Sequence, residues 1–268
     1  MILPGLGTAI AVACFRNPLF SLSILFPGAT NPERTRMDLI NRFRGLNKSC
    51  FIVGASGESG KALLKQLIKL KPFERIVLIG RRKLDYEDEE LKQLEQRVIN
   101  FDEIEKHKAE FAGFDVGYCC LGTTRGKSGA EGFVKIEHDY VVGSAINAKE
   151  GGTRHFHLIS AAGVSENSWF LYGQTKGRTD REVSELGFER TSIYRPAMLM
   201  VDRTERRVAE AMIVNMLKPI ACIAPTLITT PIEALAKAMV FKTVQDPAPS
   251  GAESVSNKEI QAAAKLIP

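Results

Sequence analysis

From residue 48 onward, short apolar runs alternate with longer stretches whose apolar residues recur at helical spacing. Residues 49–54 and 75–80 are rich in β-branched side chains and typical of strands buried on both faces. Between them, residues 58–70 place their apolar side chains on one helical face. The same patterns predict strands over 97–101, 115–121, 155–160 and 188–194, and helices over 87–96, 103–111, 131–149, 169–186, 204–218 and 231–244. This alternation predicts an α/β fold with a doubly wound parallel sheet.

The chain divides into one regular domain, predicted over residues 48–245, and two flanking segments. Residues 1–47 begin with an acid-free apolar stretch that prolines and glycines interrupt, so we expect a poorly ordered N-terminal extension. No run in it reaches the roughly 18 unbroken apolar residues that a transmembrane helix needs. Residues 246–268 are rich in proline, serine and alanine, and we expect a tail that packs loosely on the domain or trails from it.

Composition narrows the class of protein. Of the 268 residues, 44% are hydrophobic and 25% are charged, as in ordinary globular proteins. The net charge is +5, but residues 1–50 hold six basic and two acidic side chains, so the domain itself is nearly neutral. Direct nucleic-acid binding is therefore not expected. The five cysteines and four histidines lack metal-ligand spacing, and we predict no metal site.

The N-terminal segment bears on location. It lacks the positive charge that precedes the apolar stretch of a secretory signal. We therefore expect a cytoplasmic protein, with a nuclear location as an addition. An acid-poor leader that contains serine and arginine is also compatible with a mitochondrial presequence, although its content of basic residues is low.

A glycine-rich turn, GASGESG, joins the first predicted strand to the first predicted helix. Gly54 permits the tight turn, Gly57 lets the backbone approach a pyrophosphate, and Gly60 brings the helix close to the strand. The free N–H groups of the helix start would then bind the phosphates. A nucleotide-triphosphate loop is excluded, because Ala62 stands where a magnesium-binding Ser or Thr is required. The cofactor-binding residues predicted here are Gly54, Ser56, Gly57, Glu58, Ser59 and Gly60.

The end of the second strand bears on the choice of dinucleotide. NAD sites usually carry an acidic residue about 20 positions further on, which binds the ribose 2′-hydroxyl. Here the strand ends in Gly80-Arg81-Arg82, and guanidinium groups suit a 2′-phosphate. We therefore predict NADPH as the cofactor; the alternative is a solvated arginine pair. Asp102, after the third strand, either approaches the adenine or caps the helix predicted over 103–111.

The segment after the fourth strand should also reach the site. Leu121, Gly122 and Thr123 follow that strand directly, so their backbone is predicted to pass beside the cofactor. Arg125 and Lys127 come next, in a glycine-rich segment that we predict to be a mobile loop at the site mouth. Two interpretations stay open for this pair: recognition of an anionic group on the substrate, or simple solvation.

A tyrosine and a lysine supply the candidate chemistry. Tyr172 and Lys176 are four residues apart, so they share one face of the predicted helix. A nearby ammonium lowers the pKa of a phenol and makes it a usable general acid. Ser160 closes the fifth strand, where its hydroxyl could hold a substrate carbonyl oxygen. Pro196, after the sixth strand, either contacts the nicotinamide or only packs.

Together, the glycine turn, Ser160 and the Tyr172-x-x-x-Lys176 pair resemble the short-chain dehydrogenase/reductase superfamily, specifically its atypical members. The segments FIVGASGESGKALLK, LIGRRKL and CCLGTTRGKSGAEGFVK more closely resemble the animal Tat-interactive oxidoreductase family, whose members are also described as metastasis suppressors. The resemblance implies a Rossmann fold, NADPH binding and a triad of Ser160, Tyr172 and Lys176. Two departures are Ala161, where the family has a second serine, and a helix over 131–149 without an evident relay asparagine.

Two functions follow from these residues and from the resemblance. The first is an NADPH-dependent oxidoreductase that reduces a carbonyl on an unidentified small molecule, with Tyr172 as general acid, Ser160 holding the oxygen and Lys176 holding the ribose. The second is a non-enzymatic, NADPH-sensing regulatory protein that acts through a protein partner in transcription, nuclear import or apoptosis. A sugar-nucleotide epimerase is a weaker third hypothesis, because the chain has little room for a separate substrate domain.

Overall fold

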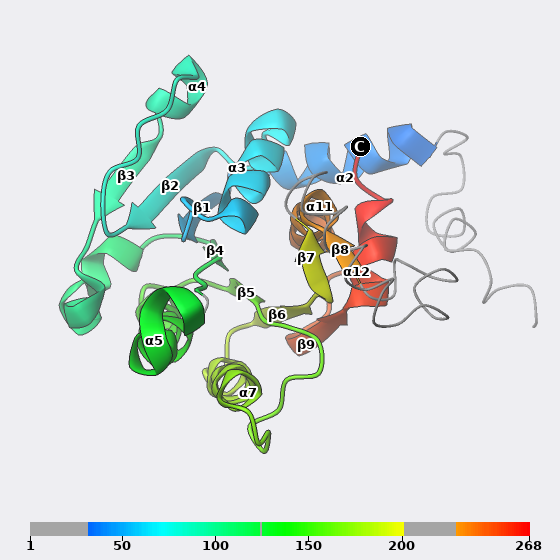
Figure 1. The fold of residues 1–268 in the computed structure, drawn as a ribbon. Helices are drawn as coiled ribbons and strands as arrows, with labels where there is room; N and C mark the ends of the chain where they lie inside the picture. The colour runs from blue at the N-terminus through cyan, green and yellow to red at the C-terminus, as the bar shows by residue number, and fades with distance from the viewer. Residues whose placement is uncertain (1–31, 124, 201–228) are drawn as a thin grey trace, which may run out of the picture.

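The computed structural model describes residues 32–123, 125–200 and 229–268. Seven parallel strands form one sheet in the order β3-β2-β1-β4-β5-β6-β9 (Figure 1). The strands are β1 (Ser49–Val53), β2 (Arg75–Gly80), β3 (Glu95–Val98), β4 (Val116–Cys119), β5 (His155–Ile159), β6 (Arg190–Arg195) and β9 (Gly251–Ser256). The chain runs outward from β1 on one side and from β4 on the other, which confirms the predicted doubly wound Rossmann fold.

Helices cover both faces of the sheet, and alternate strand residues supply the two cores. One core joins Ile52, Leu78 and Tyr118 to α3 (Glu58–Leu70), α11 (Ile232–Val244) and α12 (Asn257–Ala264). The other joins neighbouring strand residues such as Phe51 and Phe156 to α6 (Tyr140–Glu150) and α7 (Leu171–Glu185). Burial on both faces explains why the inner strands β1, β2, β4 and β5 appear in the sequence as largely apolar runs.

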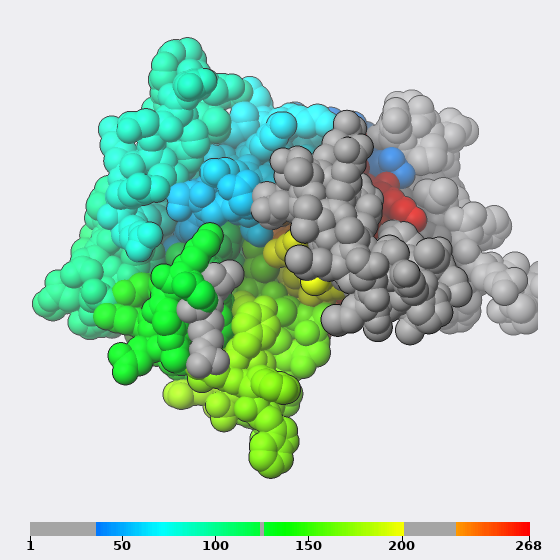
Figure 2. Space-filling model, in the orientation of Figure 1, coloured from blue at the N-terminus to red at the C-terminus, as the bar shows by residue number. Residues whose placement is uncertain are grey.

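The strand order creates a crevice at the carboxyl edge of the sheet. Val53 at the end of β1 pairs with Ile79 in β2 and with Cys119 in β4, so these three strands end at one level. Connections leave β1 and β4 toward opposite sides, and ligands of such folds bind at this switch point. In the space-filling view, the cyan surface of α3 and the green surface of the segment after β4 meet on this face (Figure 2).

The N-terminal extension is in part a packed helix. Helix α2 (Pro32–Arg44) buries Leu39 and Ile40, and Arg44 donates hydrogen bonds of 2.8 Å to the carbonyl oxygens of Leu70 and Lys71 at the end of α3. The prediction of a poorly ordered segment is therefore wrong for residues 32–47. Residues 1–31 lie outside the described part of the chain.

The expectation of a loosely packed tail is also wrong. Residues 251–256 form β9, which pairs with β6 as the seventh strand of the sheet. The Ser256 hydroxyl accepts the amide of Glu259 while the Glu259 side chain accepts the amide of Ser256, a capping box that starts α12. Ile260 of this helix is fully buried against α11. The tail is therefore part of the core of the domain.

Other elements differ from the sequence pattern in length and type. The helices predicted over 87–96 and 103–111 are a short α4 (Glu89–Lys92) and two 3₁₀ segments, η1 (Phe101–Lys106) and η2 (Lys108–Phe111). The helix predicted over 131–149 starts earlier, as α5 (Arg125–Val134), and continues through the π-helical segment η3 (Lys135–Asp139) into α6.

A second, two-stranded parallel sheet is formed by β7 (Met198–Met200) and β8 (Thr229–Pro231). The helix predicted over 204–218 lies outside the described residues. None of the described helices is long and apolar enough to span a bilayer.

Candidate active site

The glycine turn after β1 is built by close backbone contacts. Gly54 has a positive φ of 84°, and a Cβ atom there would lie 2.6 Å from the backbone of Cys120. A Cβ atom on Gly60 would lie 2.3 Å from the carbonyl oxygen of Gly54. Gly57 differs, because the nearest atom to a Cβ there, the Gly54 carbonyl oxygen, is 3.4 Å away. The protein's own packing therefore requires glycine at positions 54 and 60, but not at 57.

Helix α3 begins at this turn and presents its amino end to the crevice. Gly57 is the N-cap residue, in an extended conformation, and no side chain caps the helix. The exposed Glu58 pairs with Lys61 at 2.7 Å and so leaves the first-turn amides to other partners. Unpaired N–H groups and the helix dipole make such an end suitable for an anion.

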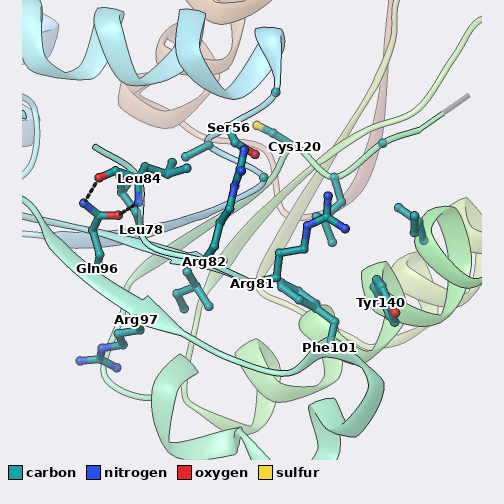
Figure 3. Close-up of a pocket in the computed structure, with 18 of the residues that line it drawn as sticks. Ser56, Leu78, Arg81, Arg82, Leu84, Gln96, Arg97, Phe101, Cys120 and Tyr140 are labelled. Atoms are coloured by element: carbon teal, nitrogen blue, oxygen red, sulfur yellow. Dashed lines mark hydrogen bonds between the residues drawn. The ribbon is translucent and has the colours of Figure 1, made fainter. Parts of the chain in front are cut away.

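An open pocket extends from the turn along the carboxyl ends of β1, β2 and β4 (Figure 3). Arg82 lies alongside Ser56, whereas the guanidinium of Arg81 lies on the Tyr140 side of Arg82 and points away from Phe101 (Figure 3). Both guanidinium groups belong to exposed residues. The predicted cofactor-binding residues that line this pocket are Gly54, Ser56, Gly57, Arg81, Arg82, Leu121, Gly122 and Thr123.

Asp102 sits just outside this pocket. Its carboxylate pairs with Lys135 at 2.6 Å and accepts a hydrogen bond from the Tyr140 hydroxyl. These two contacts hold the pKa of Asp102 below its ordinary value. The alternative role of Asp102 as a helix cap is wrong, because Asn100 caps the 3₁₀ segment by accepting the Asp102 amide. Its approach to an adenine stays a prediction.

The segment after β4 adopts a conformation that the sequence did not indicate. The prediction of a mobile loop for Arg125 and Lys127 is wrong, because both residues belong to α5, which is kinked at Gly129 with φ of 72°. Lys127 is exposed, and the side chain of Arg125 lies outside the described part of the structure. Pro196 is buried, and its carbonyl oxygen accepts the amide of Ala162 at 2.8 Å, which ties the segments after β5 and β6 together.

The predicted catalytic residues lie at the carboxyl end of β5 and on α7. Ser160 follows β5 and is 5% exposed; its hydroxyl forms no full hydrogen bond, but it lies close enough to the Asp180 carboxylate to help lower the pKa of that group. Tyr172, in the first turn of α7, is 48% exposed and packs against Phe133 with ring centroids 5.7 Å apart. The ammonium of Lys176 is buried and approaches the carbonyl oxygen of Ile159 at 3.4 Å, next to Ser160.

Glu137 is a site residue that the sequence motifs did not indicate. One oxygen of its buried carboxylate accepts the Thr123 amide at 2.6 Å, and the other pairs with the Lys176 ammonium at 2.7 Å. Phe133, Glu137 and Val141 recur at intervals of four, so the glutamate interrupts an apolar stripe. A charge on a stripe that faces the core requires a buried partner, and this signal could have identified the residue.

The ionisation of Tyr172 is also opposite to the prediction. Burial raises the pKa of Tyr172 above its ordinary value, and the carboxylates of Glu137 and Asp180 act in the same direction. The Lys176 ammonium lowers it, but that charge is paired with Glu137. The predicted depression of the tyrosine pKa is therefore wrong, because the lysine does not act alone. Asp180 in turn pairs with Arg195 at 2.9 Å.

The parallel sheet, the glycine turn and the Tyr-x-x-x-Lys face of α7 define a Rossmann protein of the short-chain dehydrogenase/reductase type. No family model matches the chain. The chain is 47% identical over 178 residues to the rat protein HTATIP2, across 66% of this chain and 74% of that protein. It belongs to the HTATIP2 family, which confirms the resemblance found in the sequence.

Two further comparisons add a fungal relative and a solved structure of the same fold. A Candida albicans protein named FMP52, mitochondrial, is 37% identical over 161 residues, or 59% of this chain and 69% of that one. Among solved structures, a short-chain dehydrogenase/reductase superfamily protein from Agrobacterium tumefaciens with bound NAD has a TM-score of 0.56. It shares 13% sequence identity, with 78% of this chain and 76% of that chain covered, so it supports the fold.

Proposed function

We propose that this protein is an NADPH-dependent reductase of a carbonyl group on a small molecule. The observation that carries the proposal is the arrangement of the crevice. The pocket lined by the glycine turn, Arg81 and Arg82 lies at the carboxyl edge of the sheet. Ser160, Tyr172 and Lys176 lie at the same edge. The Agrobacterium tumefaciens structure of the same fold, with bound NAD, supports a nicotinamide dinucleotide here.

The residues present fit such a cofactor. Gly57 has no side chain, although the protein's packing leaves room for one, so its backbone is open to a phosphate. The first turn of α3 offers N–H groups to the pyrophosphate, and the exposed Arg81 and Arg82 suit a 2′-phosphate. When bound, the dinucleotide would supply hydride to the substrate carbon. Arg81 and Arg82 favour NADPH over NADH.

Two side chains would act on the carbonyl oxygen, and Lys176 would act through one of them. The buried Ser160 hydroxyl forms no full hydrogen bond within the protein, so it can donate one to that oxygen and stabilise its developing charge. Tyr172 holds its proton at neutral pH, because burial raises its pKa, and can transfer that proton to the oxygen. Lys176 then favours the phenolate that remains, since its ammonium lowers the pKa of Tyr172.

Turnover with a panel of aldehydes, ketones and quinones tests the proposal. We expect NADPH oxidation with at least one carbonyl class, weaker activity with NADH, and loss of activity in Tyr172→Phe. Oxidation that persists in Tyr172→Phe would contradict the role of the tyrosine. Tight NADPH binding without turnover on any carbonyl would contradict the reductase.

A second function has an observation in its favour. The second serine of the family pattern is replaced by Ala161, so the site holds one hydroxyl fewer than its motif suggests. An NADPH-sensing regulatory protein needs the pocket but no proton donor. It would bind a protein partner with an affinity that depends on NADPH, and Tyr172→Phe would leave that dependence unchanged.

The location of the protein is a separate proposal. The name of the Candida albicans relative includes the word mitochondrial, which favours a mitochondrial location over the cytoplasmic and nuclear ones. Imaging of the full chain with a C-terminal fluorescent tag tests this. A tagged chain that fills the cytoplasm or nucleus would contradict it.

A further inference from the structure

A π-helical segment stands between the cofactor pocket and α7. Residues Lys135–Asp139 form η3, and both Glu137 and His138 in it are buried. An isolated π turn changes the direction of the side chains that follow, and such turns are frequent at functional sites. Here the π-helical segment contains two successive buried polar side chains, Glu137 and His138, next to the pocket.

Helix α7 holds this segment at three points. The Thr179 hydroxyl donates to the carbonyl oxygen of Glu137 at 3.0 Å, and His138 Nε2 lies 3.0 Å from Glu182. The third contact is the ion pair between Glu137 and Lys176. The carboxylate therefore has a fixed position relative to the Tyr172 face of α7.

The two carboxylate oxygens of Glu137 serve different parts of the site. Oε1 accepts the amide of Thr123, which belongs to the segment that lines the dinucleotide pocket. Oε2 lies 2.7 Å from Nζ of Lys176, one helical turn from Tyr172. A single buried side chain thus joins the wall of the pocket to the lysine of the proton-donor pair.

We propose that Glu137 is a positioning residue that holds Lys176 in place and neutralises its charge, so that Tyr172 stays protonated until a substrate accepts its proton. The inference rests on the proposed reductase function and adds a residue to it. Glu137 need not touch the substrate, since it acts through Lys176. Its bond to Thr123 gives the same residue a part in shaping the cofactor pocket.

The charges that face Tyr172 balance each other. Lys176 and Asp180 come from α7, Glu137 from η3, and Arg195 from β6 pairs with Asp180. In this set two cations oppose two anions, and burial raises the pKa of Tyr172. Removing the Glu137 charge alone leaves an excess positive charge beside the phenol and stabilises the phenolate.

The test follows the ionisation of Tyr172 and needs no turnover. Near-ultraviolet difference absorbance of phenolate is titrated in each background with and without Tyr172→Phe, which isolates this tyrosine from the other four. In Glu137→Gln we expect the ionisation of Tyr172 to move to lower pH. At a given pH below the midpoint, the phenolate fraction should be about tenfold larger, which is the effect of removing one nearby charge. Glu137→Asp, which keeps the charge, should restore most of the original transition.

A double-mutant cycle shows whether Glu137 acts through Lys176. Lys176→Met should move the transition to higher pH, and Glu137→Gln combined with Lys176→Met should return it close to that of the unmodified protein. The double variant also removes both buried charges together, so it should fold even where Glu137→Gln does not. Glu131→Gln, an exposed acid on α5, is the matched control and should change nothing.

The outcomes separate this inference from the proposed function. An unchanged Tyr172 transition in Glu137→Gln, or in Lys176→Met, overturns the role of Glu137 whether or not the protein turns over. The shifts described above without turnover on any carbonyl support the positioning role and contradict only the reductase. With turnover, the alkaline fall in rate should move to lower pH in Glu137→Gln, in step with the spectroscopic transition.

Discussion

Replacing Gly57 by alanine tests whether glycine is needed at this position for cofactor binding or for folding. A Cβ atom there would meet no atom closer than the Gly54 carbonyl oxygen at 3.4 Å, so the variant should fold. Alanine is a poorer N-cap residue than glycine, and we expect a loss of about 1 kcal/mol in unfolding free energy. In a chain of this size that lowers Tm by about 2–4 °C.

The effect on the cofactor should be far larger. The new methyl group would occupy the position from which a pyrophosphate approaches the helix amides. Loss of two hydrogen bonds to a charged group, at about 1.5 kcal/mol each, predicts roughly a 100-fold weaker affinity for NADPH. Calorimetric titration of NADPH, with thermal unfolding measured on the same samples, gives both quantities.

Gly60→Ala is the matched control. Its Cβ would lie 2.3 Å from the Gly54 carbonyl oxygen, so the backbone itself must move, and we expect about 3 kcal/mol of destabilisation. The two variants should therefore fail for different reasons. Gly57→Ala should be stable but bind NADPH weakly, whereas Gly60→Ala should be unstable. An unchanged NADPH affinity in a folded Gly57→Ala protein would refute the placement of the phosphates at this turn.

Four more outcomes follow from the structure. Arg81→Ala combined with Arg82→Ala should weaken NADPH binding by roughly 10–150-fold and leave NADH binding unchanged in calorimetry, whereas equal affinities in the unmodified protein would contradict the cofactor assignment. Tyr172→Phe should lower turnover by roughly 10²–10⁴. Because the pKa of Tyr172 is raised, the unmodified rate should show no fall from this group until above about pH 10, and an earlier fall that Tyr172→Phe abolishes would contradict the raised pKa. Ile260→Ala should cost about 2–5 kcal/mol of unfolding free energy by denaturant titration, since Ile260 is fully buried, and a negligible cost would contradict the core role of the tail.

Local patterns were sufficient for the parts of the fold in which one element follows another. The strand, glycine turn and helix that begin at Ser49 form as predicted, because the apolar run, the glycines and the helical face all lie within a few turns of chain. The Tyr172–Lys176 spacing likewise places both residues on α7. These features are determined by residues that are close together in the sequence, so a local sequence pattern is enough to predict them.

Features that depend on distant contacts were missed. Segment 251–256 has few apolar residues, and it is a strand because β6 offers an unpaired edge along its whole length. The ammonium of Lys176 seemed free to lower the pKa of Tyr172, since its partner Glu137 is 39 positions earlier in the chain. In each case the decisive partner lies in another element, so no local window could have included it.

The buried charges bear on the choice between a reductase and a sensor. Lys176 and Glu137 form an ion pair that is buried at both ends, and the buried Asp180 pairs with the partly exposed Arg195. A buried ion pair adds little stability, and apolar side chains of similar volume are often neutral or stabilising in its place. A module that only binds a dinucleotide could therefore fill this face with apolar residues at no loss. Here the charges lie beside the half-exposed Tyr172 and the Ser160 hydroxyl. Such charges are needed if Tyr172 must hold a proton and then release it. The cost of burying them favours proton transfer at Tyr172, and with it the reductase.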